Sequence, residues 1–308
     1  MRTSWRQLAP AALLLAATAC GERELFAPDG VGTLVVDGVL IVGRPLPNVY
    51  VGETLAPDAT YSIENAAVSG ATVHVRYGDR DVRYVETASG SYAPFVSEVV
   101  EAERTYALEV VTPDGRRAFA ETTTPAAFAV DRWVMLDEET LAVRDTLDSF
   151  DDRGYAVHDS TDGNVLVYRE GLLEARFERG AVPSYQVGLH SLDRESAFVI
   201  DPDFFEEEDF EELERVTSSP LLEAPDGTIR LPWLAIYFEG RYTSYVYALD
   251  RNWYDFVRTS PELGQGGPGF GGNLGDGVDA PIFHVEGGIG LFGSAAVDSV
   301  GFYIRPGR

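Results

Sequence analysis

The side chains best suited to chemistry at neutral pH are histidines, and their spacing matches no catalytic motif. None lies in an H-E-x-x-H pair, which would bind zinc on one face of a helix. His284-Val285-Glu286 has the spacing of zinc deaminases, but a chain with one cysteine lacks their second ligand pair. A Ser-His-Asp triad is defined in space, and no G-x-S-x-G elbow indicates one. We therefore predict no catalytic residue and keep an unrecognised hydrolase as an alternative. The histidines are His74, His158, His190 and His284.

Acidic residues are abundant and gather at three places that could be thought to bind calcium. Calcium needs about six to eight oxygen ligands in a compact loop, and none of the clusters has the EF-hand spacing. We expect a solvated acidic surface and predict neither a metal nor a cofactor. Two carboxylates facing each other across a cleft would support glycoside hydrolysis, so a carboxylate-dependent hydrolase stays open. The clusters are Asp148, Asp151 and Asp152; Asp159 and Asp162; and Glu206, Glu207, Glu208 and Asp209.

Two glycine-rich stretches, Gly267–Gly272 and Gly288–Gly293, match G-x-G-x-x-G by letter. A dinucleotide loop must follow a strand and open a helix whose N-terminus holds pyrophosphate. The first stretch contains Pro268 and lies in a glycine-rich loop, and the second leads into a predicted strand near the end of the chain. Neither is expected to bind a nucleotide.

The N-terminus has the order of a secretory signal. Arg2 and Arg6 precede a short apolar stretch from Leu8 to Ala17, which is too short to span a bilayer. No later segment is long and apolar enough to do so. We predict that residues 1–19 are a signal peptide.

The single cysteine, Cys20, follows this signal directly. Ala17-Thr18-Ala19-Cys20 resembles the lipobox of bacterial lipoproteins, with alanine where that family usually has leucine; Ala17-x-Ala19 also fits the ordinary signal peptidase. We predict lipid attachment at Cys20, through diacylglycerol with acyl chains such as palmitate. A single acyl chain binds membranes reversibly, whereas two or three hold a protein stably.

Composition describes a folded, strongly acidic protein. The net charge is -26 over 308 residues. Such a field repels nucleic acid and anionic lipid, so we expect neither as a partner surface. The length of 308 residues suits about two domains of roughly 150 residues each, and the hydrophobic residues, 45% of the chain, are enough for packed cores.

Residues 20–32 are predicted to be a lipidated tether, and residues 33–125 a β-sandwich. Ala71 to Tyr77 alternates apolar and polar side chains, which predicts a strand with one buried face. Pro-Asp-Gly turn signals recur beside apolar runs. Short strands with turns about every ten residues favour an immunoglobulin-like or transthyretin-like fold.

Residues 126–308 are predicted to form a second β-rich domain with short helical insertions. Thr122–Pro125 marks the boundary. Apolar runs predict strands, and two segments predict helices. The strands are expected at 164–168, 229–238, 242–249 and 297–304, and the helices at 203–216 and 250–259.

Several short motifs, in order along the mature chain, resemble the bacterial lipoprotein family called domain of unknown function 4249. The resemblance implies an envelope accessory role beside TonB-dependent receptors, without an established reaction. The chain departs from the family in its acidic segment, 201–214, and its glycine-rich loop, 264–277. The motifs are Leu34–Gly38, Val68–Val73, Gly90–Tyr92, Thr105–Leu108, Thr124-Pro125 and Gly287–Gly293.

Together these observations predict a lipid-anchored accessory or binding lipoprotein of the outer membrane, periplasmic or surface-facing. Gly21 after the cysteine, rather than aspartate, favours the outer membrane. The expected partner is a TonB-dependent receptor or another envelope protein. The alternative is a glycan-binding or adhesive module, in which Trp233, Trp253 or Tyr254 stacks on sugars instead of filling the core.

Overall fold

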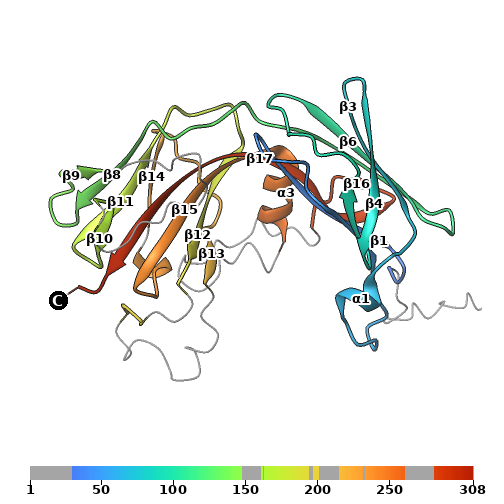
Figure 1. Cartoon of the computed structure of the whole chain (residues 1–308), viewed down its shortest axis with the longest axis horizontal. Coiled ribbons are helices and arrows are strands. Elements are labelled where there is room, and N and C mark those ends of the chain that lie inside the picture. Colours follow the sequence, from blue (N-terminus) through green and yellow to red (C-terminus); the bar gives the residue numbers. More distant parts are fainter. Residues whose placement is uncertain are drawn as a thin grey trace, which may run out of the picture.

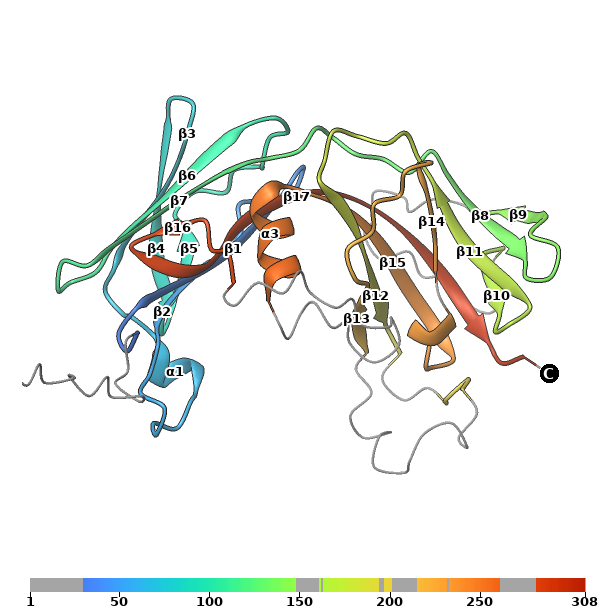
Figure 2. The same ribbon diagram turned by 180° about the vertical axis from the view of Figure 1, so that it is seen from behind.

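A computed structural model describes residues 30–147, 161, 163–193, 197–200, 215–231, 233–260 and 281–307. The chain is mostly β, as the sequence predicts. Its strands form a mixed 13-stranded sheet and a four-stranded sheet, arranged as two lobes joined in an arch (Figures 1 and 2). No helix in the described ranges is long and apolar enough to cross a membrane.

The first lobe is a set of antiparallel strands around one hydrophobic core. The alternation predicted for residues 71–77 is confirmed, since Val73, Val75 and Tyr77 are buried and the residues between them are not. The strands are β1 (Leu34–Ile41), β2 (Val49–Glu53), β3 (Thr72–Tyr77), β4 (Arg80–Ala88), β5 (Ser91–Pro94), β6 (Thr105–Val111) and β7 (Arg117–Thr123), with a short helix α1 (Ile63–Ala66).

The second lobe is a sandwich of two sheets. The smaller sheet has the order β14-β11-β8-β9, and its apolar side chains share one core with those of β12, β15 and the last strand. The elements are β8 (Arg132–Asp137), β9 (Val143–Thr146), β10 (Val165–Val167), β11 (Gly171–Arg176), β12 (Ser184–Ser191), β13 (Val216–Ser218), β14 (Thr228–Arg230), the 3-10 helix η2 (Trp233–Ala235), β15 (Gly240–Leu249) and α3 (Arg251–Thr259).

The last strand, β17 (Gly288–Arg305), runs through both lobes after the two-residue strand β16 (Val285–Glu286). Its first half pairs in parallel with β1, from Leu34 opposite Gly288 to Ile41 opposite Ala295. Its second half pairs with β15 in the antiparallel sense. Figure 1 shows it as the span of the arch. Residues from the end of the chain therefore complete the first core, and the division predicted at residue 125 stays a prediction.

Two predicted elements need correction. The strand predicted at 229–238 ends at Arg230 and gives way to η2, because proline at position 232 cannot donate to a strand ladder. The helix predicted at 203–216 does not include its last residue: Val216 begins β13 and pairs with His190. Residues 201–214 lie outside the described ranges. The helix predicted at 250–259 is confirmed as α3, with Asp250 as its N-cap.

The glycine motif Gly288–Gly293 is part of β17 and opens no helix, so it has a packing role. A Cβ at Gly288 would lie 2.7 Å from the Leu34 carbonyl oxygen. Gly290 has a φ of +111°, and a Cβ there would overlap the carbonyl oxygen of Val36. A Cβ at Gly293 would lie 3.2 Å from the backbone nitrogen of Trp253 in α3. These glycines let β1 and α3 approach β17.

We expect Gly290→Ala to lower the free energy of unfolding by about 2 to 3 kcal/mol, because it adds a steric clash to a left-handed backbone conformation. Urea denaturation measures the effect. Gly115→Ala is the matched control, with a φ of +90° but no atom within 4 Å of the new Cβ. Equal losses in the two variants would contradict the role of the close approach to β1.

Candidate functional site

A groove lies under the arch, between the first lobe and the face of β12, β13 and β15. It consists of two adjoining cavities of about 410 Å³ and 530 Å³. Both are lined by Gly188, Val216 and Tyr247, so they form one concave surface. Figures 1 and 2 show α3 under the arch beside this surface. We call these two cavities the arch groove.

A row of aromatic side chains crosses the arch groove. Tyr245 and Tyr247 alternate along β15 and therefore point to the same face. Their rings stack at 5.9 Å between centroids, and the ring of Trp253 from α3 lies 5.6 Å from Tyr247. All three are half-buried. Such a row presents flat apolar surface with polar edges, which suits planar or ring-shaped groups.

Gly188 lines the arch groove without a side chain that would fill it. It faces Tyr245 across the β12–β15 pair, and a Cβ at this position would lie 3.2 Å from the ring of Tyr247. Its φ is outside the left-handed region, so strand geometry does not require a glycine here. The missing side chain leaves room above the tyrosine rings.

The polar groups on the described lining of the arch groove do not form a hydrogen-bonded catalytic set. The uncharged ones include Gln186, Thr217, Ser218 and Ser299. Arg44 and His190 line one cavity, and Asp37 lines the other. Among the described residues, no hydrogen bond joins the His190 ring to a carboxylate or to a serine hydroxyl. The arrangement is suited to binding: an apolar, aromatic wall with a cation at one end and a carboxylate at the other.

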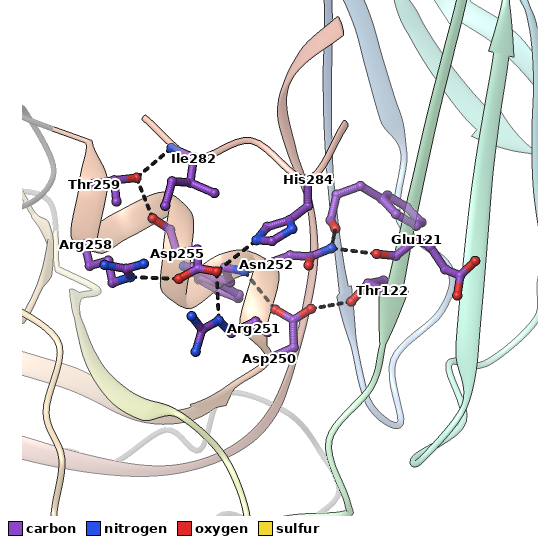
Figure 3. A network of polar contacts seen from close by, with 12 residues as sticks. Glu121, Thr122, Asp250, Arg251, Asn252, Asp255, Arg258, Thr259, Ile282 and His284 are labelled. Atoms are coloured by element: carbon purple, nitrogen blue, oxygen red, sulfur yellow. Dashed lines mark hydrogen bonds and ion pairs between the residues drawn. The ribbon is translucent and has the colours of Figure 1, made fainter. Parts of the chain in front are cut away.

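The start of α3 is held by buried polar contacts to β7 of the first lobe and to β17 (Figure 3). Asp250 accepts a hydrogen bond from the Trp253 backbone nitrogen at 2.9 Å and another from the Thr122 hydroxyl of β7. The Thr122 hydroxyl also lies 2.9 Å from that of Ser294 in β17. Burial raises the pKa of Asp250 above its usual range, because these hydrogen bonds only partly offset the lost hydration.

Asn252 makes a second connection between the lobes. Its Nδ2 donates to the carbonyl oxygen of Glu121 in β7 at 2.7 Å and to that of Phe292 in β17 at 2.8 Å. A single amide group thus joins α3 to one strand of the first lobe and to the span of the arch. This fixes the position of Trp253, the next residue, in the groove.

Asp255 is the charged centre of α3 and is 4% exposed. It receives hydrogen bonds from Arg251 at 2.8 Å, from Arg258 at 2.7 Å and from His284 at 2.9 Å. Burial acts to raise the pKa of Asp255, but the contacts with Arg258, His284 and Arg251 outweigh it and hold this pKa below its usual range. Both carboxylate oxygens are occupied. Arg251 and Arg258 belong to α3 itself, so the contact with His284 connects Asp255 to the segment before β16.

The structure separates the residues that the sequence singled out. His74 pairs with Asp81 at 2.6 Å on the surface of the first lobe, whereas His190 lines the arch groove and His284 contacts Asp255 of α3. Trp233 packs on the second core, with its ring 5.1 Å from Tyr168, and Tyr254 lies beside Arg251 and Arg258. Of the proposed sugar-stacking residues, Trp253 lies in the arch groove.

Other predicted residues lie outside the described ranges: Cys20, His158, the first stretch of G-x-G-x-x-G and the three acidic clusters. In the part of the chain that is described, no group of three or more His, Cys, Asp or Glu side chains could hold a metal ion. The sequence interpretation missed Tyr245 and Tyr247. Their alternation within a strand was the available signal.

The sequence model of one protein family, described as a domain of unknown function (DUF4249), matches residues 26–300. This range includes both lobes, α3 and most of β17. The chain belongs to this family. No curated protein matches the chain significantly. The resemblance drawn from the short motifs is therefore confirmed, and the glycine motif of this DUF4249 chain is the segment that brings β1 and α3 onto β17.

We expect Asp255→Asn to cost about 1.5 kcal/mol of unfolding free energy at pH 7, because it removes the charge of a buried carboxylate to which the partly exposed Arg251, Arg258 and His284 donate hydrogen bonds. A carboxylate whose folded pKa is depressed contributes stability above its unfolded pKa of about 4, and loses it as the pH falls. The difference between the wild-type protein and the variant should therefore shrink below about pH 4, measured by urea denaturation across pH.

Asp250→Asn provides a control with the opposite sign. Asparagine also caps helices, and the pKa of Asp250 is raised, so its ionisation costs stability as the pH rises above about 4. As the pH rises above about 4, the unfolding free energy of the wild-type protein should therefore fall relative to that of Asp250→Asn. Parallel pH curves for the two variants would show that the carboxylates do not have these different environments.

Proposed function

We propose that this protein is a lipid-anchored binding lipoprotein of the bacterial outer membrane that holds its partner or ligand in the arch groove. The observation that carries the proposal is the aromatic row of Tyr245, Tyr247 and Trp253 in a groove whose described polar groups form no hydrogen-bonded catalytic set. The proposed role is therefore recognition.

The dimensions of the arch groove support binding. Each cavity falls in the range of about 300 to 1,000 Å³ that is usual for ligand sites, which are mostly apolar with a few placed polar groups. The walls come from strands and from a helix whose buried contacts reach β7 and β17. A site built on such fixed elements loses little conformational entropy when it binds.

The anchor of the proposal is Cys20, directly after a predicted signal peptide. Acyl chains on this sulfur would keep an acidic, water-soluble pair of lobes at the membrane surface. The proposed partner is a TonB-dependent receptor, because the family resemblance implies an accessory role beside such receptors. A segment of such a receptor that protrudes from the membrane would enter the arch from its open side.

A second candidate function, glycan binding, is favoured by Trp253. Its ring lies 5.6 Å from that of Tyr247 in the groove, and sugars place their apolar faces on such rings. A glycan array separates the two functions. Binding that is lost in Trp253→Ala supports the glycan role, and silence on the array removes it.

We expect Cys20→Ser to move the protein from the membrane fraction to the soluble fraction, because the serine oxygen is not the acylated atom of a lipoprotein. Fractionation of cells and intact mass of the mature N-terminus measure the change. A bare sulfur in the wild-type protein, or a serine variant that still sediments with membranes, would remove the anchor from the proposal.

We expect Gly188→Val to reduce recovery of the partner at least tenfold, because its side chain fills the space above Tyr247. The measurement is affinity purification from solubilised envelopes after crosslinking in intact cells. Gly163→Val is the matched control: Gly163 is exposed, and no atom lies within 4 Å of a Cβ there. A partner retained equally by both variants would place its binding outside the arch groove.

A further inference from the structure

A second apolar surface lies at the end of the first lobe where β1 begins, outside the lining of the arch groove. Residues 54–66, which we call the α1 loop, connect β2 to the segment before β3 and include α1. Two large side chains of this loop are strongly exposed, Tyr61 at 72% and Ile63 at 58%. Scattered apolar side chains are normal on surfaces, but these two are neighbours on one projecting turn.

The α1 loop is held firmly, so this exposure is a fixed property of the fold. The Tyr50 hydroxyl donates to the Ile63 carbonyl oxygen at 3.1 Å, and Asn65 Nδ2 donates to Thr60 at 3.1 Å. Ser62 caps α1 through the Asn65 backbone nitrogen, also at 3.1 Å. Ala66 is buried beneath the turn. The loop therefore presents Tyr61 and Ile63 outward while its base is packed on β2.

The loop begins where the chain enters the lobe. Thr54, its first residue, accepts a hydrogen bond from the Gly32 backbone nitrogen at 2.8 Å and donates one to the Thr33 carbonyl oxygen at 3.0 Å. Its hydroxyl donates to the carbonyl oxygen of Gly30. Figures 1 and 2 show α1 at the end of the first lobe that holds the start of β1.

The length of chain before Gly30 brings this end of the lobe close to the proposed anchor. Cys20 lies ten residues before Gly30. Ten residues span at most about 35 Å when fully extended. Acyl chains on Cys20 would therefore keep the α1 loop near the lipid surface, with the rest of the first lobe farther away.

The chemistry of the loop suits an uncharged lipid surface. Tyrosine favours the boundary between lipid headgroups and acyl chains, where its ring is apolar and its hydroxyl is wet. Residues 54–66 contain Asp58 and Glu64 but no arginine or lysine, so anionic lipid would repel the loop and zwitterionic lipid would not.

We propose that the α1 loop contacts zwitterionic lipid through Tyr61 and Ile63, and so sets the orientation of the first lobe on the membrane. This inference rests on the lipid anchor of the proposed function. The contact adds a second attachment beside the acyl chains. It therefore limits rotation of the protein about its tether.

The test uses the lipidated full-length protein in phosphatidylcholine vesicles. Thr60→Cys carries an environment-sensitive fluorophore, and the vesicles contain nitroxide lipid as a quencher. Ser97→Cys is the matched control, because it is also an exposed hydroxyl residue and is flanked by the exposed Phe95, Val96 and Val99. The loop that contains Ser97 lies at the opposite end of β2 from the α1 loop. It follows β5, and its Val99 pairs with Pro45, which precedes β2, whereas Thr54 follows β2.

Quenching at position 60 is expected to exceed quenching at position 97 at least threefold. Adding Tyr61→Ser and Ile63→Ser should reduce it to the level of position 97, with an unchanged urea midpoint because both side chains are exposed. Equal quenching at the two positions, or quenching that survives the double substitution, would overturn the proposal.

Flotation of the same vesicles tests the anchor separately. If the full-length protein fails to float, the proposed lipid anchor is wrong. The loop can then be tested without it, by holding the mature chain on nickel-chelating lipid through a polyhistidine segment in place of residues 1–20. Stronger quenching at position 60 in that arrangement supports the α1 loop contact, and equal quenching removes it.

Discussion

The parallel pairing of β1 with β17 is the contact on which the rest of the structure depends. A parallel pair needs its strands to be brought together from distant parts of the chain, and here Leu34 meets Gly288. The approach is possible because Gly288 and Gly290 carry no Cβ where the β1 carbonyl oxygens pass. Since β17 continues into its pairing with β15, the same strand belongs to both cores. The lobes are thereby held by backbone hydrogen bonds, which set the width of the groove between them.

Helix α3 supports this junction with polar contacts that would be costly if any partner were missing. Asn252 and Asp250 reach β7 and β17, and Asp255 satisfies two arginines and a histidine. Buried polar groups of this kind contribute little net stability but penalise alternative arrangements strongly. We therefore interpret the network as fixing where α3 sits. Its apolar residues, Trp253 and Phe256, then face the arch groove.

Local patterns in the sequence predicted local structure well. The alternation in residues 71–77 and the apolar face of residues 250–259 each specify one element, and both elements are observed. The strand predicted at 229–238 was wrong beyond Arg230, because a run of apolar residues is compatible with a buried strand or with a 3-10 turn. The proline within the run excludes a continuous strand.

Contacts between distant segments could not be predicted in the same way. Nothing near Leu34 indicates that its partner lies more than two hundred residues later. For the same reason, the packing role of the glycine motif Gly288–Gly293 could not be predicted from the sequence. The proximity of Gly188 to the ring of Tyr247 could not be predicted either. The candidate site is made almost entirely of such contacts, so the sequence indicated Trp253 without the groove around it.

The proposed anchor and the arch groove constrain each other through β1. This strand begins at Leu34, beside the α1 loop, and Val35 and Asp37 already line the groove. A strand rises about 3.3 Å per residue, so Asp37 lies about 10 Å along β1 from its tethered end. With the α1 loop on lipid, the nearer end of the arch groove would stand just above the headgroups. An integral membrane partner could then enter the groove with a short protruding segment, whereas a ligand arriving from bulk solvent would gain nothing from this arrangement. Under the proposed anchor and loop contact, the position of the groove would favour a membrane partner over a freely diffusing ligand.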